Sequence, residues 1–350
     1  MSTRVLIASG VRHAHDYTTL LAEMPGVEVI GVAESQDAPD WAVEDSAALA
    51  CAANLPLLEY TAGMAGCDAV LVCSEPRRHA ELAVRAVQAS RHVIIDKPAA
   101  TSADEFARLQ RAAARAPELV VTSVHRLLSP AIVRTRHLID TGGIGLPLSV
   151  DCEWIASGGL DGSTVERPEL VCDPQRSGGG ELTNFGWYPL LALRHFTGLE
   201  VTEVTGFGGA LFGGPHERYG VEDCAVLSLL LERGVTATIT VARVPAGISH
   251  EPISSTFRIL GSHGHLCVDE SEPTLRVRRR GEAAATQRTI GGAAGAAALR
   301  ACFTQFFAAI EHGPSVTLGI ADISRALNTL DSARQSIRTQ TPVAVSSVAR

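Results

Sequence analysis

The stretch Val93-Ile94-Ile95-Asp96-Lys97-Pro98 is the part of the chain from which the fold can be worked out. Three apolar residues predict a buried strand, and the proline after Lys97 predicts that the strand ends there. In an open, mostly parallel α/β sheet, ligands bind beyond the carboxyl ends of the strands. Lys97 is therefore the first catalytic candidate. The alternative is a solvated lysine on a strand-to-loop turn.

Strand-like and helix-like segments alternate through the first 124 residues. Short apolar runs predict strands, and apolar residues at helical spacing predict the helices between them. Repeated units of this kind imply right-handed crossovers and a doubly wound parallel sheet, so we expect a dinucleotide-binding Rossmann domain over residues 1–124. The expected strands are residues 5–8, 27–33, 68–73, 93–95 and 119–124, and the expected helices are residues 16–24, 78–89 and 101–114.

The first strand-to-helix turn carries a thinned glycine signature. On the G-x-G-x-x-G template the three positions fall at Ala8, Gly10 and His13, so only the middle glycine is present. Gly10 would let the backbone approach a pyrophosphate, and Arg12 and His13 could add charge or donors to a phosphate. The alternative is a plain turn that needs a single glycine.

Glu34 ends the second expected strand, roughly two dozen residues after Gly10, where a dinucleotide fold places an acid against the adenosine ribose hydroxyls. No Arg or Lys follows closely in sequence, and an acidic neighbourhood repels a 2′-phosphate. The pattern therefore favours NAD over NADP.

Composition narrows the class of protein. The chain has 350 residues, 46% of them hydrophobic, which favours two domains with sizeable cores. The net charge of −8 argues against a nucleic-acid partner, and apolar runs are too short for a membrane span. Eight cysteines without a C-x-x-C pair indicate reduced thiols, with no metal site or disulfide framework, so we expect a cytoplasmic protein.

From about Leu148 the pattern changes to alternating strand-like segments separated by turns. One mainly antiparallel, open sheet is the economical interpretation, within an α+β domain over residues 125–350. The last long helical segment is expected at residues 320–339.

Four motifs resemble those of the Gfo/Idh/MocA oxidoreductases. Asp96-Lys97-Pro98 is similar to the family's E-K-P motif, and the other three lie at residues 68–79, 125–147 and 177–189. The resemblance implies a cis Lys-Pro peptide, a lysine that contacts substrate, and a terminal helix that packs back toward the first domain. It also implies a homodimer or homotetramer formed through the second sheet.

The chain departs from this family on the helix that carries catalytic side chains. Most relatives have an aspartate and, four residues later, a histidine, whereas this chain has Asn184 and Tyr188. Residues four apart share a helix face, so both can point at one substrate. A nearby ammonium favours a phenolate, so Lys97 could help Tyr188 exchange the alcohol proton. The alternative is that Tyr188 is an aromatic residue on a half-buried helix.

These observations predict an NAD(P)-dependent oxidoreductase that acts on a carbinol or keto carbon of a sugar, sugar nucleotide or cyclitol, with Lys97, Tyr188 and Asn184 as catalytic residues. Two alternatives stay open: a redox-neutral enzyme with tightly bound NAD, or a non-catalytic ligand-binding relative. The cofactor-side candidates are Gly10, Arg12, His13, Glu34, Ser74, His79, Asp96 and Lys97. The substrate-side candidates are Arg126, Trp154 and Arg176, followed by Glu153, Tyr219 and Asp223.

Overall fold

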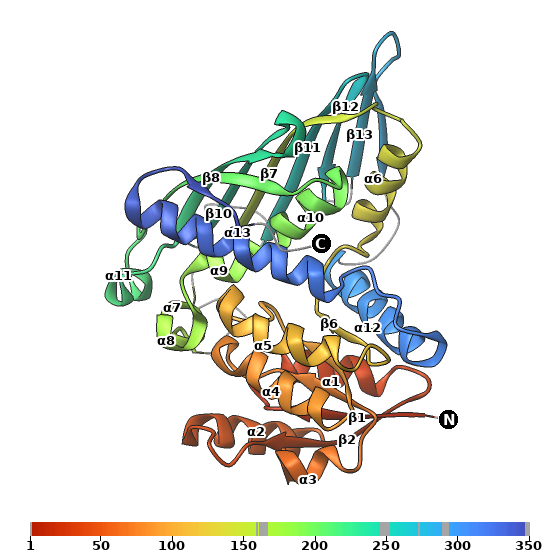
Figure 1. The fold of residues 1–350 in the computed structure, drawn as a ribbon, viewed down its shortest axis with the longest axis vertical. Coiled ribbons are helices and arrows are strands. Elements are labelled where there is room, and N and C mark those ends of the chain that lie inside the picture. Colours follow the sequence, from red (N-terminus) through yellow and green to blue (C-terminus); the bar gives the residue numbers. More distant parts are fainter. Residues whose placement is uncertain are drawn as a thin grey trace.

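The computed structural model describes residues 2–158, 160, 167–245, 253–271, 274–288 and 294–346. These residues form two sheets, one in each half of the molecule. Helix α13 (Ile320–Thr339) crosses the middle of the molecule between them (Figure 1).

The first sheet consists of β1 (Thr3–Ala8), β2 (Val27–Glu34), β3 (Leu57–Glu59), β4 (Ala69–Val72), β5 (His92–Ile95) and β6 (Val121–Ser123). All its pairings are parallel, in the order β3-β2-β1-β4-β5-β6. Every residue of β4 is buried, as expected for a sheet covered on both faces. The order reverses between β1 and β4, which places the binding crevice beyond their carboxyl ends. The predicted doubly wound Rossmann fold is confirmed.

The helices of this half are α1 (Ala14–Ala22), α2 (Asp40–Ala52), α3 (Tyr60–Met64), α4 (Pro76–Gln88) and α5 (Ala103–Ala114). Ser102 begins α5 by accepting a hydrogen bond from the Glu105 amide, and Asp104 and Glu105 lie favourably in its first turn. Residues 40–64, for which the sequence predicts no element, form α2, β3 and α3.

The second sheet consists of β7 (Pro147–Ser157), β8 (Val201–Gly209), β9 (Cys224–Leu231), β10 (Thr236–Val244), β11 (Ile253–Gly261), β12 (Gly264–Asp269), β13 (Thr274–Arg279), β14 (Ala285–Arg288) and β15 (Val343–Ala344). Its pairings are antiparallel apart from that of β7 with β10. This confirms the expected mainly antiparallel sheet.

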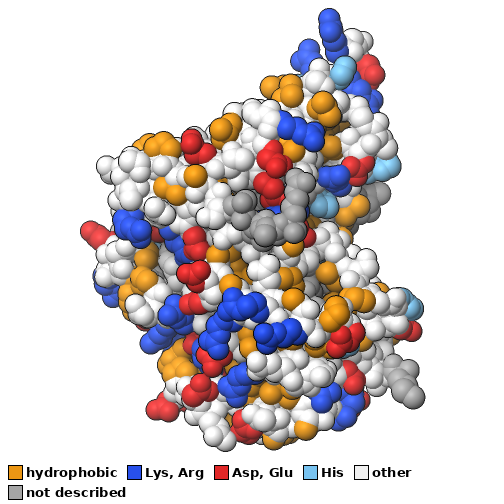
Figure 2. Space-filling view, viewed as in Figure 1, with side chains coloured by type: hydrophobic (Ala, Val, Ile, Leu, Met, Phe, Trp, Pro, Cys, Tyr) orange, Lys and Arg blue, Asp and Glu red, His pale blue; other side chains and the backbone are white. Residues whose placement is uncertain are grey.

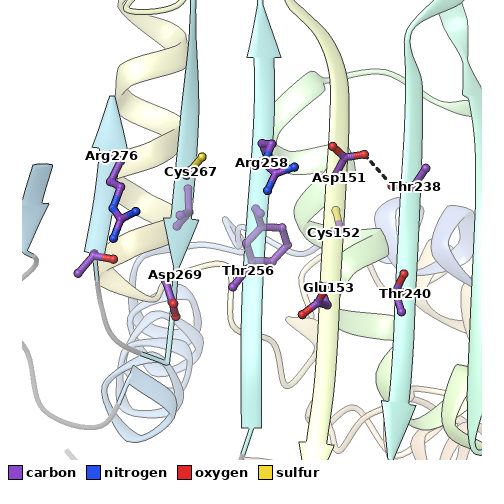
Figure 3. A pocket seen from close by; sticks show the side chains of 13 residues that line it. Asp151, Cys152, Glu153, Thr238, Thr240, Thr256, Arg258, Cys267, Asp269 and Arg276 are labelled. Atoms are coloured by element: carbon purple, nitrogen blue, oxygen red, sulfur yellow. Dashed lines mark hydrogen bonds between the residues drawn. The ribbon is translucent and has the colours of Figure 1, made fainter. Parts of the chain in front are cut away.

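One face of the second sheet is packed against helices and the other is open. The helices that follow β6 are α6 (Pro130–Asp140), α7 (Glu169–Cys172), α8 (Pro174–Ser177), α9 (Glu181–Phe185), α10 (Trp187–Thr197), α11 (Pro215–Tyr219) and α12 (Ala294–His312). The open face has a shallow depression whose floor carries charged side chains of both signs and threonines (Figure 3). Asp151 and Thr238 are hydrogen-bonded across it.

Helix α13 ties the two halves together near Lys97. It contacts α5 and β6 on one side and β8 and α10 on the other. The Arg334 guanidinium donates to the carbonyl oxygens of Thr101 (2.7 Å) and Gly178 (2.6 Å). Arg334 thereby joins the loop after the Lys97-Pro98 turn to the glycine-rich loop before α9.

Candidate active site

The carboxyl end of β5 presents Asp96 and Lys97, followed by a cis Lys97–Pro98 peptide. The Asp96 carboxylate is fully buried and accepts hydrogen bonds from Tyr17 Oη (2.7 Å) and the Lys97 amide (2.7 Å), with His13 Nδ1 2.8 Å away. Burial alone would raise the pKa of Asp96, but the charges of His13 and Arg12 hold it well below its ordinary value. Asp96 therefore anchors α1 to the strand end.

The Lys97 side chain extends toward the second half of the molecule. Its Nζ donates to the Asn184 side-chain oxygen (2.7 Å) and main-chain oxygen (3.1 Å), and only 4% of the residue is exposed. Nζ also lies 5.4 Å from the ring centroid of Tyr188 and 5.8 Å from that of Phe185. Burial, followed by the charge of Arg12, lowers the pKa of Lys97 to about 7. This amine can therefore change its charge near neutral pH.

Tyr188 lies in the first turn of α10 and stacks on Trp154 from β7, with ring centroids 4.4 Å apart and planes at 16°. Arg126 lies over the other ring of the pair, 5.0 Å from Trp154. Burial raises the pKa of Tyr188, a direction opposite to the one expected from the nearby lysine. The side chain is therefore a neutral phenol at physiological pH.

Arg12 approaches this cluster from the glycine-bearing loop. Its guanidinium donates to Asn184 Oδ1 (3.1 Å) and, weakly, to the Lys97 carbonyl oxygen (3.4 Å). The structure thus brings together the catalytic candidates Lys97, Asn184 and Tyr188 with Arg12. The substrate-side candidates Arg126 and Trp154 lie beside Tyr188.

The loop at Gly10 is in contact with helix α2. The Gly10 amide donates a hydrogen bond to Ser46 Oγ (2.7 Å), and a Cβ on Gly10 would lie 2.6 Å from Ser46 Cα. Val11 is buried with Ala42 and Leu170 in a cluster that spans both halves. The close approach that Gly10 permits is taken in this structure by the protein's own helix.

Glu34 is engaged in the same network. Its carboxylate accepts hydrogen bonds from the hydroxyls of Ser9 (2.6 Å) and Ser46 (3.0 Å), and from Arg78 Nη1 (2.8 Å). Arg78 lies in the first turn of α4, far along the chain from Glu34, so sequence neighbours alone do not describe the charge around Glu34. The sequence-based expectation that no basic residue lies near Glu34 is therefore wrong, because Arg78 binds its carboxylate in the folded protein.

The remaining cofactor-side candidates have internal partners. His79 is fully buried, with Nδ1 2.7 Å from the Pro98 carbonyl oxygen and Nε2 2.7 Å from that of Ser74. Ser74 is fully buried too, and its hydroxyl donates to the Glu75 carbonyl oxygen. These contacts fix the backbone next to the cis peptide.

The other substrate-side candidates lie away from Lys97. Arg176 pairs with Asp173 and lies over the Trp41 ring of α2. Glu153 lines the depression on the outer face of the sheet, opposite to its neighbour Trp154. Tyr219 is exposed at the end of α11, and the Asp223 carboxylate accepts the backbone amides of the 211–212 loop.

The sequence holds one further signal for this site, outside the four motifs. Lys97 is the only lysine in the chain, and every other basic residue except histidine is arginine. An arginine stays charged at all relevant pH values, whereas a buried lysine can lose its proton. The one position with an amine is the one that contacts Asn184 and Tyr188.

The described residues contain no group of three or more His, Cys, Asp or Glu side chains that could hold a metal ion. All eight cysteines are free. Among the described helices, none is long and apolar enough to cross a bilayer. On the face shown in Figure 2, the largest group of basic side chains is bordered by acidic ones.

The parallel sheet, with its order reversing between β1 and β4, defines a Rossmann fold, the class of fold that binds dinucleotides at this switch point. Residues 5–124 match the family described as "Oxidoreductase family, NAD-binding Rossmann fold", and residues 132–267 match "GFO/IDH/MocA C-terminal domain". The chain belongs to the Gfo/Idh/MocA family of oxidoreductases, and residues 5–124 are its NAD-binding Rossmann domain.

Three curated relatives match part of the chain. Inositol 2-dehydrogenase 1 of Saccharopolyspora erythraea is 31% identical over 48% of this chain and 50% of its own length. The dTDP-3,4-didehydro-2,6-dideoxy-alpha-D-glucose 3-reductase of Saccharopolyspora spinosa is 31% identical over 61% of each. The uncharacterized oxidoreductase YrbE of Bacillus subtilis is 26% identical over 59% of this chain. The matches span 50% to 61% of these relatives' lengths.

Solved structures share the fold over the whole chain. A levoglucosan dehydrogenase in complex with NADH has a TM-score of 0.84 at 18% identity, covering 99% of this chain and all of that one. A scyllo-inositol dehydrogenase from Lactobacillus casei has a TM-score of 0.80 at 17% identity, with the same coverage. At these identities the likeness establishes the fold alone.

Proposed function

We propose that this chain is an NAD-dependent oxidoreductase that transfers a hydride between the nicotinamide and a carbinol or keto carbon of a sugar, sugar nucleotide or cyclitol. The observation that carries the proposal is the convergence of Lys97 and Tyr188. They come from opposite halves of the molecule, yet Nζ lies 5.4 Å from the phenol ring. Dehydrogenases and reductases among the relatives support the reaction class.

Lys97 and Tyr188 have separate roles in this proposal. The Lys97 ammonium donates a hydrogen bond to the carbonyl oxygen, while Asn184 holds the ammonium in place. Tyr188 donates its proton to that oxygen as the carbon gains the hydride, and solvent then reprotonates the phenolate. NAD, when bound, supplies or accepts the hydride.

Reduction fits Tyr188 better than oxidation does. Because burial raises its pKa, the side chain holds its proton at neutral pH and can give it to a developing alkoxide. Alcohol oxidation needs the base form, which this environment disfavours. Among the relatives, the ketosugar reductase therefore supports the direction that we propose, and a ketosugar is the substrate class to test first.

Gly10 and Glu34 are the groups that would hold the dinucleotide, and Ser46 now satisfies both. Its hydroxyl accepts from the Gly10 amide as a phosphate oxygen would, and donates to Glu34 as a ribose hydroxyl would. The hydrogen-bonding groups fit the cofactor, but the space does not. Binding in this account requires α2 to move away from Gly10.

A non-catalytic, ligand-binding relative is the second candidate, and the same contacts favour it. With Ser46 on Gly10 and Arg78 on Glu34, the dinucleotide groove is closed by the protein's own side chains. Titration with NADH and NADPH by calorimetry separates the two functions. Binding of NADH supports the enzyme, whereas no binding of either cofactor leaves only the second candidate.

Absorbance at 340 nm, followed with a panel of ketosugars and cyclitols, tests the reaction itself. Net loss of NADH with a ketosugar supports our proposal. Turnover of substrate without any absorbance change, with NAD copurifying, indicates a redox-neutral enzyme with tightly bound NAD.

We also propose that a second copy of the chain covers the open face of the second sheet. Phe207, Val226 and Leu230 are exposed there on adjacent strands, and a sheet face of this kind is a common homo-oligomer interface. We propose that the first domain ends at residue 124 and the second begins at residue 125. The eight unpaired cysteines support a reducing, cytoplasmic location.

A further inference from the structure

A buried carboxylate, Glu181, lies beside the residues to which we assign catalysis. It is wholly inaccessible and begins α9. Its Oε1 lies 2.5 Å from Arg243 Nε and 3.0 Å from His216 Nε2, and its Oε2 accepts a hydrogen bond from Asn184 Nδ2 (2.9 Å). Neither the motifs nor the proposed reaction uses this residue.

Glu181 determines which way the Asn184 amide faces. An ionised carboxylate only accepts hydrogen bonds, so the amide must turn its NH2 group toward Glu181. The amide oxygen then points to the opposite side, where it accepts from Lys97 (2.7 Å) and Arg12 (3.1 Å). A neutral amide is thereby held with its oxygen between two cations.

We propose that Glu181 is a positioning residue: through the Asn184 amide it holds the Lys97 amine beneath Tyr188 and supplies the negative charge that keeps this amine protonated. The inference rests on the proposed function for the meaning of Lys97, but the arrangement itself does not require a substrate.

The charge balance around Lys97 supports this role. The charged or titratable groups that face it, from every element packed against it, are Arg12, Asp96, Glu181, Tyr188 and Arg243. Asp96 is bound to Tyr17 and His13 at the start of α1 and to the Lys97 backbone amide. Glu181 is therefore the anion on the second-domain side, where it also balances Arg243. Without it, Lys97 would lie near the guanidinium groups of Arg12 and Arg243 and would lose the negative charge on the second-domain side.

Because Lys97 is the only lysine in the sequence, the proposal can be tested on a single NMR resonance. Protein made with lysine labelled with carbon-13 at Cε gives a single side-chain resonance, whose pH titration reports the Lys97 amine without substrate or cofactor. We expect Glu181→Gln to lower the titration midpoint by roughly one pH unit. Glu181→Gln with Asn184→Asp, which returns a carboxylate to the Lys97 side, should restore or raise it.

A nearby carboxylate provides the matched control. Glu222 is half-buried, but its carboxylate accepts the Leu182 amide and forms no hydrogen bond with Asn184. Glu222→Gln should leave the Lys97 midpoint unchanged. If Glu222→Gln shifts it as much as Glu181→Gln does, or if Glu181→Gln has no effect, the proposal is wrong.

Asn184→Leu covers the case in which Glu181→Gln does not fold because the buried ion pair between Glu181 and Arg243 is lost. This variant removes the amide and leaves Glu181, Arg243 and His216 paired. A lowered titration midpoint of Lys97 supports the proposal that Glu181 acts through the Asn184 amide, and an unchanged midpoint overturns it. Absence of turnover by the wild type would contradict the proposed function but would not affect the Lys97 titration, so the two failures are distinguishable.

Discussion

The amide of Gly10 donates a 2.7 Å hydrogen bond to the Ser46 hydroxyl, so the turn that should face a dinucleotide instead contacts helix α2. In the binding mode that we propose, Ser46 competes with the cofactor for this donor. We expect Ser46→Ala to tighten NADH binding about fivefold to tenfold, because one neutral hydrogen bond contributes roughly 1 kcal/mol. Calorimetry with NADH measures this, with Ser332→Ala on α13 as the control. Weaker binding by Ser46→Ala would show that the hydroxyl contacts the cofactor.

A second prediction concerns the ion pair that holds α2 against the other half. Arg167 donates two hydrogen bonds to the Asp45 carboxylate (2.8 and 3.1 Å) and lies over the Trp41 ring. If α2 must move to admit the cofactor, Arg167→Ala should speed NADH association several-fold in stopped-flow fluorescence. Arg136→Ala, which removes a surface pair with Asp140, serves as the control. An unchanged association rate would mean that α2 does not limit access.

Tyr188→Phe removes the proposed proton donor and keeps the ring that stacks on Trp154. We expect turnover to fall at least about 100-fold, the usual contribution of a positioned acid, with NADH affinity unchanged. Tyr219→Phe, on an exposed helix end, should keep full activity. Equal activity of Tyr188→Phe and wild type would remove the phenol from the mechanism.

The Lys97 amine also makes stability depend on pH. Its folded-state pKa of about 7 lies below the ordinary 10.5, so between these values the unfolded chain binds more protons than the folded one. The free energy of unfolding should therefore rise with pH in this window, by up to about 1.4 kcal/mol per unit, relative to Lys97→Met. Urea titrations of both proteins at several pH values measure the difference. Parallel curves would mean that the amine has an ordinary pKa.

Phe207→Asp, on the open face of the second sheet, should dissociate the proposed oligomer. Phe207 is 65% exposed in the single chain, so a charge there is harmless to the fold but costly at an apolar interface. Light scattering after size exclusion gives the mass. A wild-type monomer, or an unchanged mass for the variant, would place the interface elsewhere or remove it.

The doubly wound parallel sheet, and the position of Lys97 at the end of one of its strands, could be predicted from the sequence. Short apolar runs that alternate with helical periodicity are local signals. The sequence could not show that Arg78 reaches Glu34 or that Ser46 reaches Gly10. Those contacts join segments whose spacing carries no motif, and only the packing of α2 and α4 on the sheet brings them together.

Part of the candidate site could also be predicted from local sequence spacing. Asn184 and Tyr188 were predicted to share a face from their spacing on a helix, and both do lie near Lys97. Glu181 was missed because a buried acid next to glycines has no periodic signature. The direction of the Tyr188 pKa was misjudged because burial exceeds the influence of the nearby cation.

In the function that we propose, Lys97 and Tyr188 act on one carbonyl beside a bound nicotinamide. The most direct measurement is mass spectrometry of the product after incubation of a ketosugar panel with NADH deuterated at C4 of the nicotinamide. We expect one deuterium on the product carbon with the wild type, and little or none with Lys97→Met or Tyr188→Phe. Equal deuterium transfer by all three proteins, or none by the folded wild type with any ketosugar, would contradict it.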